Sequence, residues 1–197
     1  MKTLVTVGCL LLSSIVGCAS SDPSQEPVST DGAELKAVGG DLGRLREATD
    51  RYHDVANAYA DGFFPADGTC TSSPGAPYAP PGAMGIHFIN PARMNLPPDP
   101  TSPGVLLYEP VGDKLRLVGV EFFQPAFLVG GPPWFDPTSP PPGPVVPAPV
   151  LFGQTFDGPM AGHTPGMPWH YDMHVWIWRD NPNGMFSQFN PKVSCGG

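Results

Sequence analysis

Apolar side chains recur every three or four residues along one stretch of the chain, from Asp41 to about Ala60. The stripe consists of Leu42, Leu45, Thr49, Tyr52, Val55, Ala56 and Tyr59. This spacing predicts an amphipathic α-helix, with Asp41 placed to cap its start and Gly62 to end it. His53 lies on the flank of the stripe, and we interpret it as a partly exposed helix residue.

Beyond this helix the pattern shortens to runs typical of β-strands. Four such runs are Met84 to Asn90, Val105 to Tyr108, Lys114 to Phe123 and Trp169 to Trp178. Gly112-Asp113, between the second and third runs, predicts a hairpin. Short helical turns are expected after Asn90 and around residues 183–189.

Together these elements predict one α+β domain over residues 41–197. In it an N-terminal amphipathic helix packs on a mostly antiparallel sheet, which is curved or forms a partial barrel. The 28 Pro and 24 Gly of the 197 residues approach the share that signals disorder. Proline is concentrated in residues 96–103 and 125–149, however, and the aromatic residues lie in the apolar runs between. We therefore expect long Pro/Gly-rich loops on a folded core.

The N-terminus has the pattern of an export signal. Lys2 precedes an apolar stretch, Leu4 to Val16, that is too short to span a bilayer. The stretch ends in Ile15-Val16-Gly17-Cys18, which resembles the lipobox of bacterial lipoproteins. That resemblance implies cleavage after residue 17 and acylation of Cys18, for example with palmitate. An ordinary secretory signal with an accidental cysteine is the alternative.

Residues 18–40 are rich in Ser, Pro, Asp, Glu and Gly and show no apolar periodicity, so they predict a flexible tether after Cys18. The expected location is therefore extracytoplasmic, on the periplasmic or surface face of a membrane that the lipid contacts. The net charge of -8 and the scattered basic residues exclude nucleic acid as an expected partner, because phosphate backbones would be repelled.

Two cysteines remain once Cys9 is removed with the signal and Cys18 is acylated. Cys70 and Cys195 would lie in a compartment where disulfides persist, and we expect them to pair. Closing so long a loop stabilises the fold by up to about 4 to 5 kcal/mol in the chain-entropy model. The chain has no Cys-x-x-Cys spacing, so a structural bond is favoured over a redox pair.

The segment from Gly158 to His174 holds three of the five histidines. On a strand, a period of two divides its end between two faces. The first face would carry His170, Asp172, His174, Trp176 and Trp178, and the second Tyr171, Met173, Val175 and Ile177. The polar residues of the first face would be buried in an apolar strand, where they need partners.

A metal ion is one such partner, since imidazole and carboxylate bind zinc, iron or manganese, and thioether suits copper. Strand residues two apart lie about 7 Å apart and residues four apart about 13 Å. The practical pairs are therefore His170 with Asp172, or Asp172 with His174. Other strands offer His87 and Glu121, each a lone polar residue in an apolar run. These five residues are the predicted metal ligands.

Two other interpretations of the same residues remain open. Each histidine could be hydrogen-bonded in the core, with Glu121 paired to Arg116 or another basic residue. The second interpretation is a copper site, because methionine and histidine alternate in a pattern that resembles periplasmic copper-handling proteins. The residues concerned are Met160, His163, Met167, His170, Met173 and His174. His163 lies in a Gly/Pro loop and could be a solvated residue, a lid or a ligand.

Familiar catalytic motifs are absent from the sequence: it has no Gly-x-Ser-x-Gly elbow, no phosphate-binding Gly-rich loop and no His-Glu-x-x-His helix. Acid-base work by Glu121, Asp172 or His174, with or without a metal, remains. An enzyme would need a pocket, with Trp176, Trp178 or Phe122 expected to line it. The open alternatives are a non-catalytic copper- or small-ligand-binding protein and a structural envelope lipoprotein without metal.

Several segments resemble, as a set, a group of bacterial exported proteins without assigned activity. They are Met84-Gly-Ile-His-Phe-Ile-Asn-Pro91, Leu106-Leu-Tyr-Glu-Pro110, Leu115-Arg-Leu-Val-Gly-Val-Glu121, His170-Tyr-Asp-Met-His-Val-Trp-Ile-Trp178, Asn181-Pro-Asn-Gly-Met-Phe186 and Asn190-Pro-Lys-Val-Ser-Cys195. The resemblance extends from about Leu45 to the end of the chain. It implies a shared fold and brings no mechanism.

Overall fold

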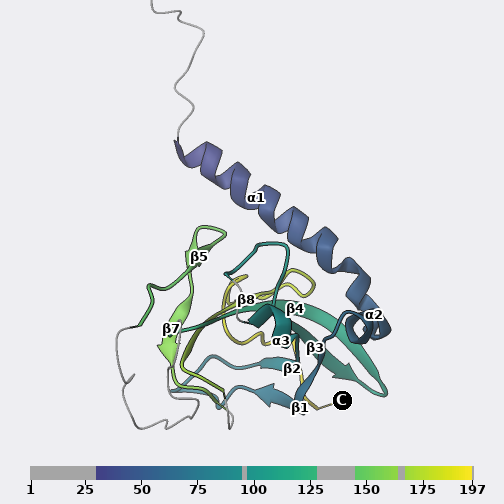
Figure 1. Cartoon of the computed structure of the whole chain (residues 1–197). Helices are drawn as coiled ribbons and strands as arrows, with labels where there is room; N and C mark the ends of the chain where they lie inside the picture. Colours follow the sequence, from purple (N-terminus) through teal and green to yellow (C-terminus); the bar gives the residue numbers. More distant parts are fainter. Residues whose placement is uncertain (1–29, 95–96, 128–144, 164–166, 197) are drawn as a thin grey trace, which may run out of the picture.

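The computed structural model describes residues 30–94, 97–127, 145–163 and 167–196 (Figure 1). The expected signal segment 1–17, the expected lipidation at Cys18 and the tether up to residue 29 lie outside the described residues. So does most of the proline-rich stretch 125–149. Within the described part, no helix combines the length and apolar character that crossing a membrane requires.

The N-terminal helix is longer than expected and is broken near its end. It comprises α1 (Thr30–Thr49), the 3-10 turn η1 (Asp50–His53) and α2 (Val55–Ala60). The prediction that Asp41 caps the helix is wrong, because α1 begins at Thr30 and Asp41 pairs with Arg44 inside it. Residues 30–40, which the sequence assigns to the tether, are therefore helical.

The break at residue 54 has a local cause. Asp54 adopts an extended conformation and its side chain accepts a hydrogen bond from the Ala56 N–H at 3.0 Å, so it caps α2 as a new helix. The prediction for Gly62 is confirmed, since this residue follows α2 with a φ of 86° that favours glycine.

The sheet has six strands in the order β1-β2-β3-β4-β8-β7, and every neighbouring pair is antiparallel. The order is open, so the described strands form no closed barrel. The strands are β1 (Phe64–Ser72), β2 (Ala83–Ile89), β3 (Val105–Val111), β4 (Lys114–Pro125), β7 (Asp157–Met160) and β8 (His170–Val175). A separate ribbon pairs β5 (Val150–Leu151) with β6 (Gln154–Thr155). This confirms the mostly antiparallel α+β prediction.

Two of the predicted local features are present and one is not. Val111 pairs with Lys114 across the expected hairpin turn. The short helix α3 (Pro91–Met94) follows Asn90 as expected. Residues 183–189 form hydrogen-bonded turns and no helical turn, so that prediction is wrong.

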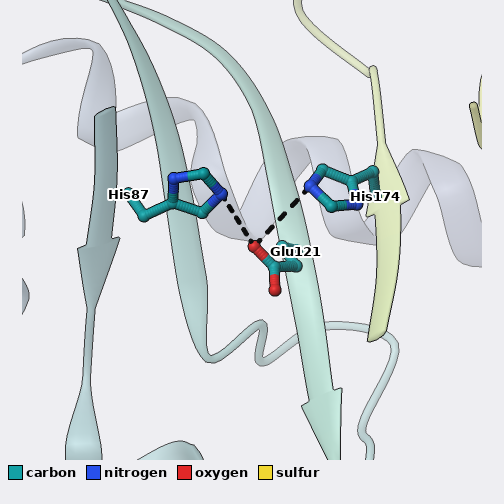
Figure 2. A group of neighbouring side chains, drawn as sticks. All are labelled: His87, Glu121 and His174. Atoms are coloured by element: carbon teal, nitrogen blue, oxygen red, sulfur yellow. Dashed lines mark ion pairs between the residues drawn. The ribbon is translucent and has the colours of Figure 1, made fainter. Parts of the chain in front are cut away.

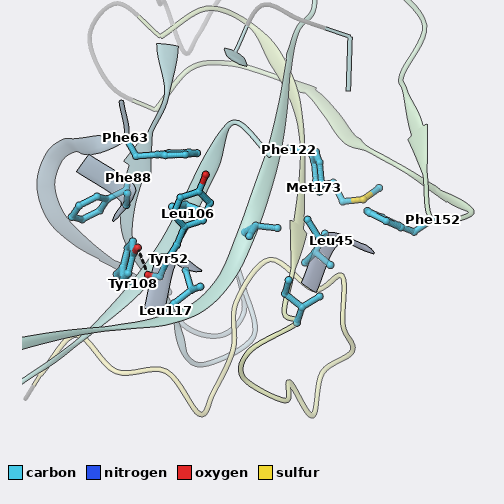
Figure 3. Packing of buried hydrophobic residues seen from close by; sticks show 14 of the residues in the cluster. Leu45, Tyr52, Phe63, Phe88, Leu106, Tyr108, Leu117, Phe122, Phe152 and Met173 are labelled. Carbon is cyan, nitrogen blue, oxygen red and sulfur yellow. Dashed lines mark hydrogen bonds between the residues drawn. The ribbon is translucent and has the colours of Figure 1, made fainter. Parts of the chain in front are cut away.

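One face of the sheet packs against the helices and forms the larger core (Figure 3). Leu106, Tyr108 and Phe122 on this face are almost fully buried, together with Leu45 of α1. Burying each such side chain stabilises the fold by about 1.5 to 3 kcal/mol. The Tyr108 hydroxyl donates to the backbone carbonyl of Tyr52 at 2.7 Å, which fixes the helical segment on the sheet.

The opposite face carries a smaller apolar cluster and the C-terminal segment. Val105, Leu107, Trp176 and Val193 belong to this cluster. The predicted disulfide is confirmed, because Cys195 is bonded to Cys70 of β1. The chain therefore returns across β1 and β2 at its end, and its C-terminus lies beside β1 in Figure 1.

Candidate metal centre

Three of the five predicted ligands come together on the face opposite the helices (Figure 2). His87 comes from β2, Glu121 from β4 and His174 from β8. The register explains their meeting, since Glu121 lies directly opposite His174, and His87 is paired with Leu107 on the strand between. Paired residues of antiparallel strands point to the same face, so all three side chains do.

The distances within this triad suit a metal ion. Glu121 Oε2 lies 3.3 Å from His87 Nε2 and 3.8 Å from His174 Nε2. One ligand atom from each residue lies within 4.8 Å of the other two. Two ligands at about 2.1 Å from a tetrahedral zinc ion are about 3.4 Å apart, so small side-chain movements complete the geometry. The triad could hold a metal ion.

Burial leaves these polar atoms without ordinary partners. Glu121 is 3 % and His174 is 2 % exposed. Glu121 Oε2 and both ring nitrogens of His174 are buried without a hydrogen-bond partner. Most buried polar atoms in folded proteins have such a partner, and those that lack one need an explanation such as an ion.

The charges of the triad depend on one another. Burial raises the pKa of the Glu121 carboxyl. The neighbouring His174 and His87 lower this pKa by more than burial raises it, so the net shift is downward. Burial lowers the pKa of His87, while its ion pair with Glu121 raises it by more. Glu121 is therefore a carboxylate, the form in which it ligates a cation.

The other two predicted ligands form a second pair nearer the start of β8. His170 Nε2 lies 3.7 Å from Asp172 Oδ2, which is the pairing that the strand spacing predicts. Both residues are buried, and His170 Nε2 and Asp172 Oδ1 have no hydrogen-bond partner. His170 does not join the triad of His87, Glu121 and His174.

A cavity of about 690 Å³ opens over this face of the sheet. Triad residues and Asp172 are part of its wall, with apolar side chains around them. Besides these four, the wall includes Met84, Ile89, Met94, Val105, Phe123, His163, Met167, Gln188 and Phe189. The predicted aromatic lining is wrong, because Phe123 lines this cavity and Phe122 points into the helix-side core.

Trp176 lies on the same face as His174, as the alternation predicts. Trp178 does not, because β8 ends at Val175 and the regular alternation ends after it. Trp178 packs on the helix side, where its Nε1 donates to Thr49 Oγ1 at 3.2 Å and Arg46 lies over its ring. Trp176 packs in the smaller cluster, with its Nε1 donating to the carbonyl of Ser187. Neither lines the cavity.

The copper interpretation loses one of its residues. Met173 lies on the opposite face from His174 and packs in the helix-side core, so the two cannot share an ion. Met160 is paired with His170 on the cavity side. Met167 lines the cavity beside His163, and its sulfur accepts a hydrogen bond from the His163 N–H at 3.3 Å.

The alternative partner for Glu121 is also wrong. Arg116 Nη1 lies 3.2 Å from Glu109 Oε2, and Glu109 Oε1 accepts a hydrogen bond from the Ser194 N–H. His53 is exposed as expected and lies against Trp178, outside the cavity.

Sequence reasoning missed the contribution of distant segments to the cavity wall. Gln188 and Phe189 reach it because the segment that contains them pairs Asn190 with Ala83 of β2. No local pattern around residue 189 predicts this pairing, although the disulfide between Cys70 and Cys195 indicates that the C-terminus returns to β1. No protein-family model, curated protein or solved structure matches the chain.

Proposed function

We propose that this protein is an exported lipoprotein that binds a divalent transition metal through His87, Glu121 and His174 and acts with it on a small molecule. The observation that carries the proposal is the meeting of three buried ligand atoms, from three strands, in the wall of a cavity. Buried polar atoms without partners are costly in a purely structural core. A cation would satisfy them together.

The donor set favours a hard or borderline metal. Two imidazoles and one carboxylate are ligands of zinc in hydrolases and of iron in oxygenases, whereas copper(I) prefers sulfur. Three protein ligands leave coordination positions free for water or substrate. A site of this kind supplies Lewis acidity and lowers the pKa of a bound water. Zinc, iron and manganese are therefore the proposed cofactors.

The cavity supports a small substrate. Its volume of about 690 Å³ lies in the range of small-molecule sites. Among the described residues no Lys or Arg lines it, so in that part of the wall an anionic group of a substrate would have to be bound by the metal ion. Glu121 and His174 serve as ligands, and Asp172 lies beside them in the wall.

The compartment follows from the same proposal. The disulfide between Cys70 and Cys195 supports an oxidising location outside the cytoplasm. We propose that Cys18 is the lipidated residue and that its lipid inserts into a membrane. Replacing Cys18 with Ser should move the full-length protein from the membrane fraction to the soluble fraction, and an unchanged distribution would contradict the anchor.

Elemental analysis of the full-length protein tests the metal site. We expect bound transition metal in the wild type and the loss of at least one ion per chain in His87→Ala, Glu121→Ala and His174→Ala. His53→Ala is the matched control, because His53 is exposed outside the cavity. A wild-type protein that is metal-free, folded and unchanged by chelator and by added zinc would refute the proposal.

A further inference from the structure

We infer that His170 and Asp172 form a second cation position beside the same cavity. It uses none of the three ligands of the triad and therefore goes beyond the proposed function. The ion bound at this second position is a divalent transition metal, because the donors are again imidazole and carboxylate. Each of the two positions can fail a test without the other.

The orientation of His170 is the first step. Its Nδ1 lies 2.9 Å from the carbonyl oxygen of Pro168, which can only accept, so Nδ1 carries the proton. In the neutral ring Nε2 then has a lone pair and points toward Asp172 Oδ2 at 3.7 Å. A backbone carbonyl holding the far nitrogen is the usual arrangement around a metal-binding histidine.

Two acceptors facing each other need a cation between them. His170 is 0 % and Asp172 is 3 % exposed, so bulk water does not separate the two groups. His170 Nε2 and Asp172 Oδ1 have no hydrogen-bond partner. The separation of 3.7 Å is close to the roughly 3.4 Å between two ligands of one tetrahedral metal ion.

Two neighbouring rings hold this pair in place. Phe123 stacks on the His170 ring with centroids 4.7 Å apart, which restricts its rotation. The His163 ring meets the His170 ring edge-on, with centroids 5.3 Å apart. His163 and Asp172 both line the cavity.

The two positions share strand β8. Asp172 and His174 are two residues apart on the same face, about 7 Å along the strand. Asp172 also lies opposite Phe123, as His174 lies opposite Glu121. The two cations would therefore lie side by side along β8, with the first bound at the triad and the second nearer the start of the strand.

Titration of the metal-free full-length protein with Co²⁺ alone tests the inference. Elemental analysis and the visible absorption of bound Co²⁺ should give two ions per wild-type chain. Asp172→Asn and His170→Gln should each reduce this to one. Asp113→Asn in the exposed hairpin turn and His53→Gln are the matched controls and should bind two.

The outcomes separate the two proposals. One Co²⁺ per wild-type chain, lost in His87→Ala and kept in Asp172→Asn, overturns the second position and means that a proton joins His170 to Asp172. Loss of an ion in Asp172→Asn with none in His87→Ala would instead contradict the triad. Circular dichroism of each variant excludes unfolding as the cause, and Asp172→Asn keeps the side-chain shape if His170→Gln does not fold.

Discussion

The two faces of one sheet differ in how their buried polar groups are satisfied. On the helix side, Tyr108 donates to Tyr52, and Thr49 donates to the Leu45 carbonyl at 2.8 Å. On the cavity side, Glu121, His170, Asp172 and His174 carry all five buried side-chain atoms without a partner among the described residues. The same strands thus build a self-sufficient core on one face and a set of unsatisfied ligands on the other.

Two buried glutamates differ in the same way, one with protein partners and one without. Glu109 has a protein partner for each oxygen, Arg116 for one and the Ser194 N–H for the other. Glu121 has two histidines near one oxygen at 3.3 and 3.8 Å, and that oxygen makes no hydrogen bond. Burial of a carboxylate is therefore not enough to indicate a site, and the lack of local partners is the informative feature.

We expect the largest loss of stability when the disulfide that attaches the C-terminal segment to the cavity side is removed. Replacing Cys70 and Cys195 with Ser together removes a cross-link between residues 125 positions apart. The chain-entropy model then predicts a loss of about 5 kcal/mol in the free energy of unfolding. Urea unfolding of the variant and of the reduced wild type measures it, and the two should agree. An unchanged midpoint would show that the segment is held by its other contacts alone.

Adjacent leucines compare the two faces directly. Leu106 and Leu107 are both fully buried, but Leu106 packs in the helix-side core and Leu107 in the smaller cluster beside the cavity. We expect Leu106→Ala to lower the free energy of unfolding by about 4 kcal/mol and Leu107→Ala by about 2 kcal/mol. The smaller cluster can collapse more easily into the space left. Equal losses in urea unfolding would show that both faces are equally rigid.

The helix-side face was largely predictable because its signal is periodic and local. Apolar residues at Leu45 and Tyr52 predict the helix stripe, and the alternation along β4 and β8 assigns the two faces of the sheet. The helix boundaries were not predictable in this way. Residues 30–40 have no apolar stripe, and the interruption at Asp54 depends on one side-chain hydrogen bond.

The cavity-side face was predictable in residue type but not in geometry. Lone polar residues in apolar runs identified His87, Glu121 and His174, yet only the strand order β2-β3-β4-β8 determines that they converge. Spacing along β8 correctly paired His170 with Asp172. Trp176 was placed on the correct face but packs in the smaller cluster there. Trp178 was misplaced because the end of β8 at Val175 depends on the turn that follows it, which the period of two cannot show.

Metal binding should stabilise only the cavity-side face. Zinc at one hundred times its dissociation constant should raise the free energy of unfolding of the metal-free protein by about 2.7 kcal/mol for one site. His174→Ala should lose the contribution of the triad, whereas His53→Ala should keep the full wild-type response. Thermal unfolding with and without zinc measures both. A zinc response in His174→Ala equal to that of the wild type would place the bound ion elsewhere.

Replacement by leucine should change the free energy of unfolding in opposite directions for the groups that contain the two glutamates. Changing His87, Glu121 and His174 together to Leu removes every member of a buried ionic group, and such replacements often stabilise a metal-free protein, here by about 2 kcal/mol. Glu109→Leu instead leaves the Ser194 N–H and Arg116 without their acceptor and should destabilise by about 1 to 2 kcal/mol. Urea unfolding of metal-free protein measures both signs. Destabilisation by the triple change would mean that the triad, like Glu109, holds the fold together, and the distinction between the two faces would then rest on metal binding alone.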